Sequence, residues 1–188
     1  MSASQPTTIH LKDYRPPAFR IHTTQLHFTL LPEYTEVSAT LQMERLTNGD
    51  EPLRLHGHEL QLQELRVDGR VLQSDEYAAD EEGLTLYSVP ARFEFRSVVR
   101  IEPHKNTALE GLYQSRGLYC TQCEAEGFRK ITYYLDRPDV LSVFTTTVVA
   151  PQQLCPVLLT NGNRIDAGVN GDGTHFATWH DPFPKPAY

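Results

Sequence analysis

Apolar and polar residues alternate along much of this chain, and this period of two constrains the possible folds more than any other feature. The alternation is clearest in residues 26–30 and 37–43, where every second residue is apolar. Successive side chains of a strand point to opposite faces, so each run predicts a strand with one buried face. The connection between them begins with Pro32, and we therefore predict that the two runs form a hairpin.

The same pattern returns several times before the C-terminus. Shorter runs lie at 53–55, 60–62, 65–67, 84–86 and 93–101, and further β-prone segments lie at 143–149 and 176–179. Turn-forming dipeptides such as Asp68-Gly69 and Asn161-Gly162 separate several of these runs. No stretch shows the helical period of ~3.6 residues. The sequence predicts an all-β fold with antiparallel or mixed sheets, and the strand spacing favours two packed, sandwich-like sheets in a single domain over residues 1–188.

The two ends of the chain differ from these runs. Residues 1–13 form a polar lead-in, and the paired prolines at 16–17 keep the next residues extended. Residues 181–188 contain three prolines, so we expect an extended strap without a strand ladder. Such a strap resembles a linker that stops before its next element. We therefore expect the chain to be one domain of a longer protein.

Charge and composition narrow the class of partner. The 24 acidic residues outnumber the 17 basic ones, which gives a formal net charge of -7, and no long basic run occurs. This argues against nucleic acid or an anionic membrane as the main partner. No apolar stretch reaches the ~18 residues of a membrane span, and the first residues lack a signal-peptide layout. Three cysteines do not make a disulfide framework, so we expect a cytoplasmic protein.

The densest chemistry lies in residues 120–129. Cys120-x-x-Cys123 has the spacing of a zinc knuckle or a redox pair, but a structural zinc site needs four ligands and no second ligand pair is present. We interpret both as reduced cysteines in a turn. His56 and His58 likewise have no evident third ligand, and we expect them to be exposed at a strand end. No nucleophile signature or phosphate-binding glycine loop occurs, so we predict no catalytic residue and no metal ligand in this chain.

Gln122, Glu124 and Glu126 are the remaining polar candidates in this segment. If it is extended, their side chains share one face of a strand. An amide oxygen beside a carboxylate is a good receptor for a primary ammonium, because the oxygen accepts an N–H group and the carboxylate supplies charge. Spacing alone favours the simpler interpretation, a solvated acidic strand edge.

Several longer segments resemble one known family. The resemblance spans nearly the whole chain from Tyr14 onward and is weakest in residues 32–104. Its most specific parts include the Thr-Gln-x-Glu motif, and the segments that carry it are 106–115, 120–129, 131–140, 158–164 and 181–186. These segments look like the N-terminal domain of bacterial aminopeptidase N, a zinc-dependent alanyl aminopeptidase of the gluzincin class.

The resemblance implies a saddle-like β-domain that precedes a thermolysin-like catalytic domain. In that family the glutamine and first glutamate of the motif hold the α-amino group of a peptide substrate, and these positions are Gln122 and Glu124 here. No contact is carried over to Glu126. The zinc-binding His-Glu-x-x-His motif is not in this sequence, so the expected partners are the substrate N-terminus and the protein's own catalytic domain, which binds the zinc.

The resemblance also implies the role of the parent enzyme. It would remove alanine and other neutral or basic residues from peptide N-termini during peptide breakdown, while this chain alone would be inactive. The alternative is a free-standing β-sandwich interaction module without a catalytic role.

Overall fold

The computed structural model describes residues 10–188 and confirms the all-β prediction. Its helical segments are the short 3-10 turns η1 (Leu11–Asp13), η2 (Pro103–Lys105) and η3 (Phe128–Lys130). No helix within this part of the chain is long and apolar enough to cross a membrane. The strands are β1 (Phe19–Leu30), β2 (Thr35–Arg45), β3 (Leu53–His56), β4 (Gln61–Val67), β5 (Arg70–Val71), β6 (Tyr77–Asp80), β7 (Gly83–Leu86), β8 (Arg92–Ile101), β9 (Gly111–Ser115), β10 (Leu118–Gln122), β11 (Ser142–Pro151), β12 (Asn163–Val169) and β13 (Thr174–Lys185).

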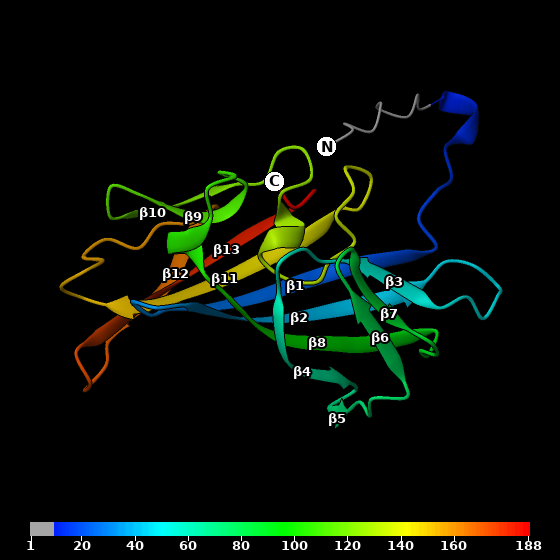
Figure 1. Ribbon diagram of the computed structural model, residues 1–188, viewed down its shortest axis with the longest axis horizontal. Coiled ribbons are helices and arrows are strands. Elements are labelled where there is room, and N and C mark those ends of the chain that lie inside the picture. Colours follow the sequence, from blue (N-terminus) through cyan, green and yellow to red (C-terminus); the bar gives the residue numbers. More distant parts are fainter. Residues whose placement is uncertain (1–9) are drawn as a thin grey trace, which may run out of the picture.

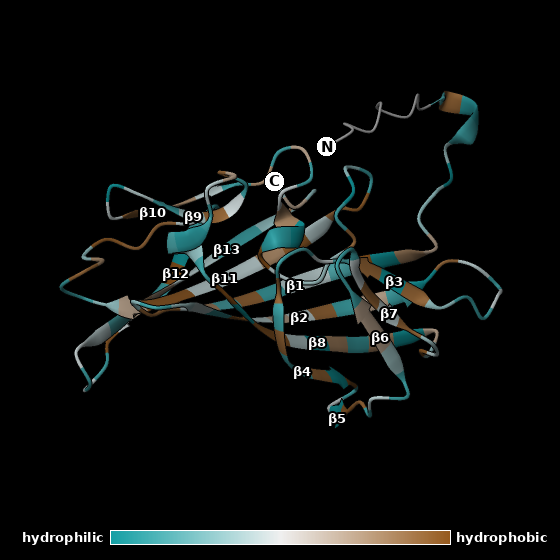
Figure 2. Ribbon diagram, viewed as in Figure 1, coloured by the Kyte–Doolittle hydropathy of each residue, from teal (hydrophilic) through white to brown (hydrophobic). Residues whose placement is uncertain are grey.

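One large mixed sheet runs the length of the molecule (Figure 1). Its eight strands have the order β12-β13-β11-β1-β2-β8-β4-β5, and only the β1–β11 pair is parallel among them. The predicted hairpin is confirmed, because β1 and β2 pair antiparallel with Leu26 opposite Ala39 and Phe28 opposite Val37. These four side chains are buried. Figure 2 shows the matching bands of hydrophobic and hydrophilic residues across β1, β2 and β8.

Two small sheets accompany the large one, so the structure adds a third sheet to the two that strand spacing predicts. One is the three-stranded sheet β3-β7-β6, and the other is the hairpin β9–β10. The three-stranded sheet lies over one end of the large sheet (Figure 1). Its inward leucines belong to the same core cluster as the large sheet and are at most 1% exposed: Leu53, Leu55, Leu84 and Leu86. Burial of this apolar face drives the packing of the two sheets.

The C-terminal strap differs from the prediction. Strand β13 continues through the proline-rich segment to Lys185, and Asp181 and Lys185 lie opposite Phe144 and Ser142 of β11. The reason is that β12 reaches only as far as His180, so beyond that residue one side of β13 has no pairing strand within residues 10–188. Prolines are tolerated where a strand has such a free edge, and the ladder shifts register between Ser142 and Phe144, where the extra residues lie in β13.

The polar lead-in is described only in part. Residues 1–9 lie outside the described residues, while His10 to Asp13 are exposed and include η1.

Aromatic side chains of the segment after β10 pack on the large sheet. The rings of Phe128 and Tyr134 meet edge to face with centroids 4.9 Å apart, and Phe128 also contacts Phe144 of β11 edge to face. The Tyr134 hydroxyl is 3.1 Å from the hydroxyl of Thr24 in β1, which is 2.8 Å from that of Ser142. The backbone around Phe128 is therefore held on β1 and β11, directly beside the candidate site.

Candidate functional site

A groove of about 630 Å³ lies over the β1 and β11 face of the large sheet. Its floor is apolar, and its walls come from the β9–β10 hairpin, from residues 154–161 and from the C-terminal residues 185–188. Gln122 and Glu124 both line this groove and are exposed. The structure therefore brings together the two residues that the family motif singles out, at the edge of an apolar cleft.

The segment that carries these residues is a turn, so the condition for a shared strand face over residues 122–126 is not met, and Glu124 and Glu126 lie in an exposed turn rather than on a strand edge. Strand β10 ends at Gln122, and residues 124–127 turn back so that the N–H of Gly127 donates to the Cys123 carbonyl at 2.8 Å. The Gln122 amide donates a long bond of 3.4 Å to the Glu124 carbonyl. The peptide bond between Glu124 and Ala125 is cis.

The turn separates the two glutamates. Glu126 does not line the groove, and its carboxylate instead lies 3.3 Å from the Arg129 guanidinium. The Glu124 carboxylate has no ion-pair or hydrogen-bond partner among residues 10–188. Its charge is thus available to a cationic ligand that enters the groove, whereas that of Glu126 is partly neutralised within the chain.

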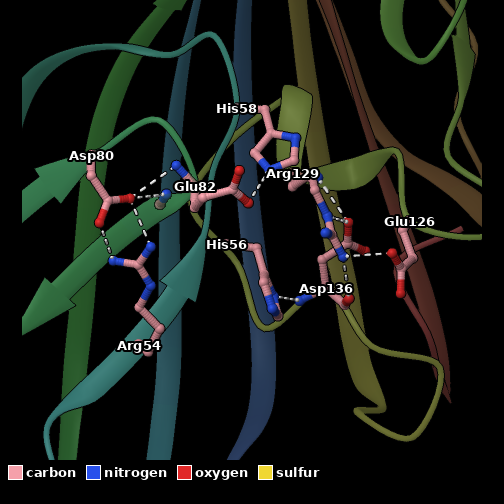
Figure 3. Close-up of polar contacts among 9 residues, drawn as sticks. Arg54, His56, His58, Asp80, Glu82, Glu126, Arg129 and Asp136 are labelled. Atoms are coloured by element: carbon pink, nitrogen blue, oxygen red, sulfur yellow. Dashed lines mark hydrogen bonds and ion pairs between the residues drawn. The ribbon is translucent and has the colours of Figure 1, made fainter. Parts of the chain in front are cut away.

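Beneath the turn, Arg129 and Asp136 form a mostly buried ion pair (Figure 3). One oxygen of the Asp136 carboxylate accepts bonds from the Arg129 backbone N–H at 3.1 Å and from Nε at 2.9 Å. The guanidinium also donates to the Asp136 carbonyl at 3.1 Å. The Asp136 side chain is 3% exposed and that of Arg129 is 14% exposed. The short segment between them is thereby closed into a fixed loop.

His56 and His58 connect this ion pair to the three-stranded sheet. The prediction that they are exposed is wrong, since both are half-buried. The Asp136 N–H donates to His56 Nδ1 at 3.2 Å, and the His58 N–H donates to the Arg129 carbonyl at 2.9 Å. The His58 ring lies 3.4 Å from the Glu82 carboxylate. The end of β3 pairs with the chain after η3, because the His56 backbone bonds with that of Tyr134. This pairing partly covers both imidazole rings.

Sequence reasoning did not single out Arg129, Asp136 or His56 for this role. The signal was present in part, because Asp136 directly follows residues 131–135, all of which are buried. A carboxylate after such a run requires a charged or donor partner. His56 could not be found this way, since it is 80 residues away in sequence.

Acidification is expected to destabilise the domain through His56. Burial, and then the nearby Arg129 charge, lower the pKa of His56 below its usual 6.5, while Asp136 and Glu126 oppose this. The unfolded chain therefore binds the proton first, so the contribution of His56 to stability is complete above pH 6.5 and is lost as the pH falls through the lowered pKa. Chemical denaturation at about pH 7 and about pH 5 measures the loss.

His56→Asn is the matched variant for this prediction. An asparagine oxygen replaces the Nδ1 acceptor without titrating, so the variant should lose less stability on acidification than the unchanged chain. His27, whose pKa burial also lowers, keeps part of the dependence in both proteins. An equal loss in both proteins would contradict the assignment to His56.

The described residues do not fit a zinc site. Within residues 10–188, no three His, Cys, Asp or Glu side chains gather closely enough to hold a metal. The three cysteines are free, and burial raises the pKa of Cys123 to about 12, so this residue stays a neutral thiol at physiological pH. A cysteine acts as a redox nucleophile only as a thiolate, so Cys123 is a poor candidate for that role. Among the described residues, the turn thus offers exposed carboxylate and amide groups and no cluster of metal ligands.

Curated relatives of this chain include aminopeptidases from several bacteria. The chain is 48% identical over 188 residues to an aminopeptidase N of Caulobacter vibrioides, covering 100% of this chain and 22% of that protein. It is 45% identical over 184 residues to an aminopeptidase N of Escherichia coli, covering 98% of this chain and 21% of that protein. The chain thus spans about a fifth of the length of these relatives.

Solved structures show the same fold. Legionella pneumophila aminopeptidase A, in complex with aspartic acid, matches with a TM-score of 0.87 at 31% identity over 95% of this chain and 21% of that one. An M1 zinc metallopeptidase of Deinococcus radiodurans, bound to a Tyr-Ser-Ala substrate, shares the fold at a TM-score of 0.75 and 17% identity over 90% of this chain and 40% of that one. The model of the peptidase M1 N-terminal domain matches residues 20–188, and the chain belongs to this family.

Proposed function

We propose that this chain forms one wall of the active site of a zinc-dependent aminopeptidase and anchors the free α-amino group of the substrate through Gln122 and Glu124. The observation that carries the proposal is the placement of both side chains along an apolar groove, with the Glu124 carboxylate unpaired within residues 10–188. The aminopeptidase names of the relatives support it.

The physical basis of the proposal is the charge of a peptide N-terminus. A free α-amino group has a pKa of about 7.7–8.0, so it is largely cationic at neutral pH. Glu124 pairs with this ammonium, and the Gln122 side-chain oxygen accepts one of its N–H groups. An internal peptide bond brings no such charge and leaves the carboxylate without a partner, which disfavours its binding. Holding the amine also positions the first peptide bond for cleavage.

In this proposal the zinc is bound outside this chain. Zinc supplies the activation of water and of the scissile carbonyl in such enzymes. Because residues 10–188 offer no ligand set for it, a separate catalytic domain of the same protein holds the metal, and this chain alone is inactive. In this proposal the full-length enzyme is cytoplasmic and acts in peptide catabolism. It removes alanine and other neutral or basic residues from peptide N-termini.

The rim of the groove fits a docked domain. Several large apolar side chains around it are 49–74% exposed: Leu118, Leu154, Val157, Leu159 and Tyr188. Exposed apolar surface of this kind marks an interaction site. We assign it to the protein's own catalytic domain, which would close the groove over the substrate.

Mixing this chain with a separately prepared catalytic domain tests the proposal. We expect the mixture, supplied with zinc, to hydrolyse an alanyl anilide while neither part does so alone. Glu124→Gln in this chain should leave the mixture largely inactive even where the two parts associate. Hydrolysis by this chain alone with stoichiometric zinc would refute the assignment of the chemistry to another domain. A reading frame without a His-Glu-x-x-His motif after Tyr188 would favour a free-standing interaction module.

A further inference from the structure

The turn that carries Gln122 and Glu124 has little support of its own. Its internal bonds are those of the Gly127 N–H to the Cys123 carbonyl at 2.8 Å and of the Gln122 amide to the Glu124 carbonyl at 3.4 Å. Residues 124–126 are exposed, so no packing holds them from outside. A binding site needs its side chains held within ~0.5 Å of the productive geometry. Gln122 is held in the β9–β10 ladder opposite Gly111, so further support for residues 124–126 must come from the residues that follow the turn.

Arg129 and Asp136 supply a rigid base for the turn. The Asp136 carboxylate accepts both the backbone N–H and the Nε of Arg129, so it fixes this residue at its main chain and at its side chain (Figure 3). The guanidinium reaches back to Glu126 at 3.3 Å, within the turn itself. Because the carboxylate is almost fully buried, water does not compete for these bonds.

A second set of bonds ties the same base to the three-stranded sheet. The backbone of His56 exchanges hydrogen bonds with that of Tyr134 at 2.8 and 3.1 Å, and the His56 ring accepts the Asp136 N–H. The His58 N–H donates to the Arg129 carbonyl. Residues 129–136, beneath the turn, are thus hydrogen-bonded to the end of β3 and packed on the large sheet. The turn cannot move far without moving these residues as well.

We propose that Arg129 and Asp136, braced by His56, are positioning residues that hold Gln122 and Glu124 in the geometry for capturing the substrate amine. The inference rests on the proposed function of those two residues. Without the Arg129–Asp136 bonds, the chain still buries Phe128 and Tyr134, but the turn is no longer fixed relative to the groove. Amine capture then weakens although both anchoring side chains remain.

The test compares matched variants in the full-length enzyme that contains this chain. Asp136→Asn preserves the side-chain shape and removes the negative charge. Arg129→Lys preserves the positive charge and removes the planar guanidinium with its several N–H donors. Asp80→Asn is the control, because Asp80 also pairs with an arginine, Arg54, through two bonds, at 2.7 and 2.9 Å, but on an exposed surface. Glu124→Gln reports on the anchor itself. The readouts are KM and kcat on an alanyl anilide, and hydrogen exchange of residues 122–130 in this chain.

We expect Asp136→Asn to lower kcat/KM on the order of tenfold to a hundredfold, mainly by raising KM, and to speed hydrogen exchange in the turn. Arg129→Lys should give a smaller shift of the same kind, and Asp80→Asn should give neither. A purely structural role would instead lower the active fraction, which reduces kcat at an unchanged KM and speeds exchange throughout the domain rather than in the turn alone. That pattern in Asp136→Asn overturns the proposal, and if this variant does not fold, Arg129→Lys decides by the same criteria.

These variants distinguish loss of the amine anchor from loss of its positioning. A normal KM in Glu124→Gln would refute the anchoring function, whatever the results for the other variants. A raised KM in Glu124→Gln together with a normal KM in both Asp136→Asn and Arg129→Lys leaves the anchor standing and refutes only the positioning role.

Discussion

Replacing Glu124 with alanine should reduce kcat/KM on alanyl substrates on the order of a hundredfold in the full-length enzyme. Removing one member of a desolvated charge pair costs about 2–5 kcal/mol, and each ~1.4 kcal/mol is a factor of ten in rate. The loss should exceed any effect on folding, because the Glu124 side chain is exposed and makes no ion pair within the described residues. Steady-state kinetics beside a thermal denaturation curve measures both quantities.

Glu126→Ala is the control for this prediction. Glu126 lies in the same turn and has the same charge, but it does not line the groove and is 62% exposed at its side chain. An exposed ion pair such as that with Arg129 contributes only about 0–1 kcal/mol, so we expect at most a severalfold loss. Equal losses in the two variants would show that the turn acts only through its net charge.

Gly127→Ala should disturb the site through its backbone. The φ and ψ angles of Gly127 are -86° and -12°, which alanine adopts easily, so conformation is no obstacle. Space is the obstacle, because an added Cβ would lie 2.7 Å from the Gln122 carbonyl oxygen and 3.0 Å from the Cys123 Cα. The Gly111 nitrogen is 3.2 Å away on another side. Since these are main-chain atoms, the turn itself must shift.

The expected cost of this shift appears in two measurements. Overpacking of this kind typically costs about 1–3 kcal/mol of stability, with a Tm decrease of about 2–4 °C for each kcal/mol. Displacement of Gln122 should reduce kcat/KM by about tenfold or more in the full-length enzyme. Gly171→Ala is the control, because nothing lies within 4 Å of the added Cβ there and stability and activity should both be retained. A fully active Gly127→Ala would contradict the close approach.

Much of the fold could be predicted from the alternation of apolar residues. Strands β2 and β8 alternate along nearly their whole length, and β1 alternates on each side of a bulge near Ile21, so their existence follows from local pattern. The pairing of β1 with β11 does not, since it joins residues 23–29 to residues 143–149 in parallel. Strand β11 is half-buried at nearly every position and carries no alternation that could set its register. The pairing of β11 with β1 is determined by the core that they share.

The candidate site was predictable to a different extent. The motif points to Gln122 and Glu124, whose role stays a prediction, but the period of a strand does not give their geometry, because the chain turns after β10 and brings Gly127 close to Gln122. Arg129 and Asp136 are only 7 residues apart, but His56 contacts Asp136 from 80 residues away in the sequence. Local propensity carries no information about such contacts.

The central claim is that Glu124 recognises the charged amine of the substrate. Inhibition constants of an alanine-derived inhibitor with a free α-amino group, and of its counterpart without the amine, test this directly in the full-length enzyme. The unchanged enzyme should strongly prefer the amine-bearing inhibitor, and Glu124→Gln should lose most of that preference while binding the other inhibitor equally well. The same preference in both enzymes would contradict the account.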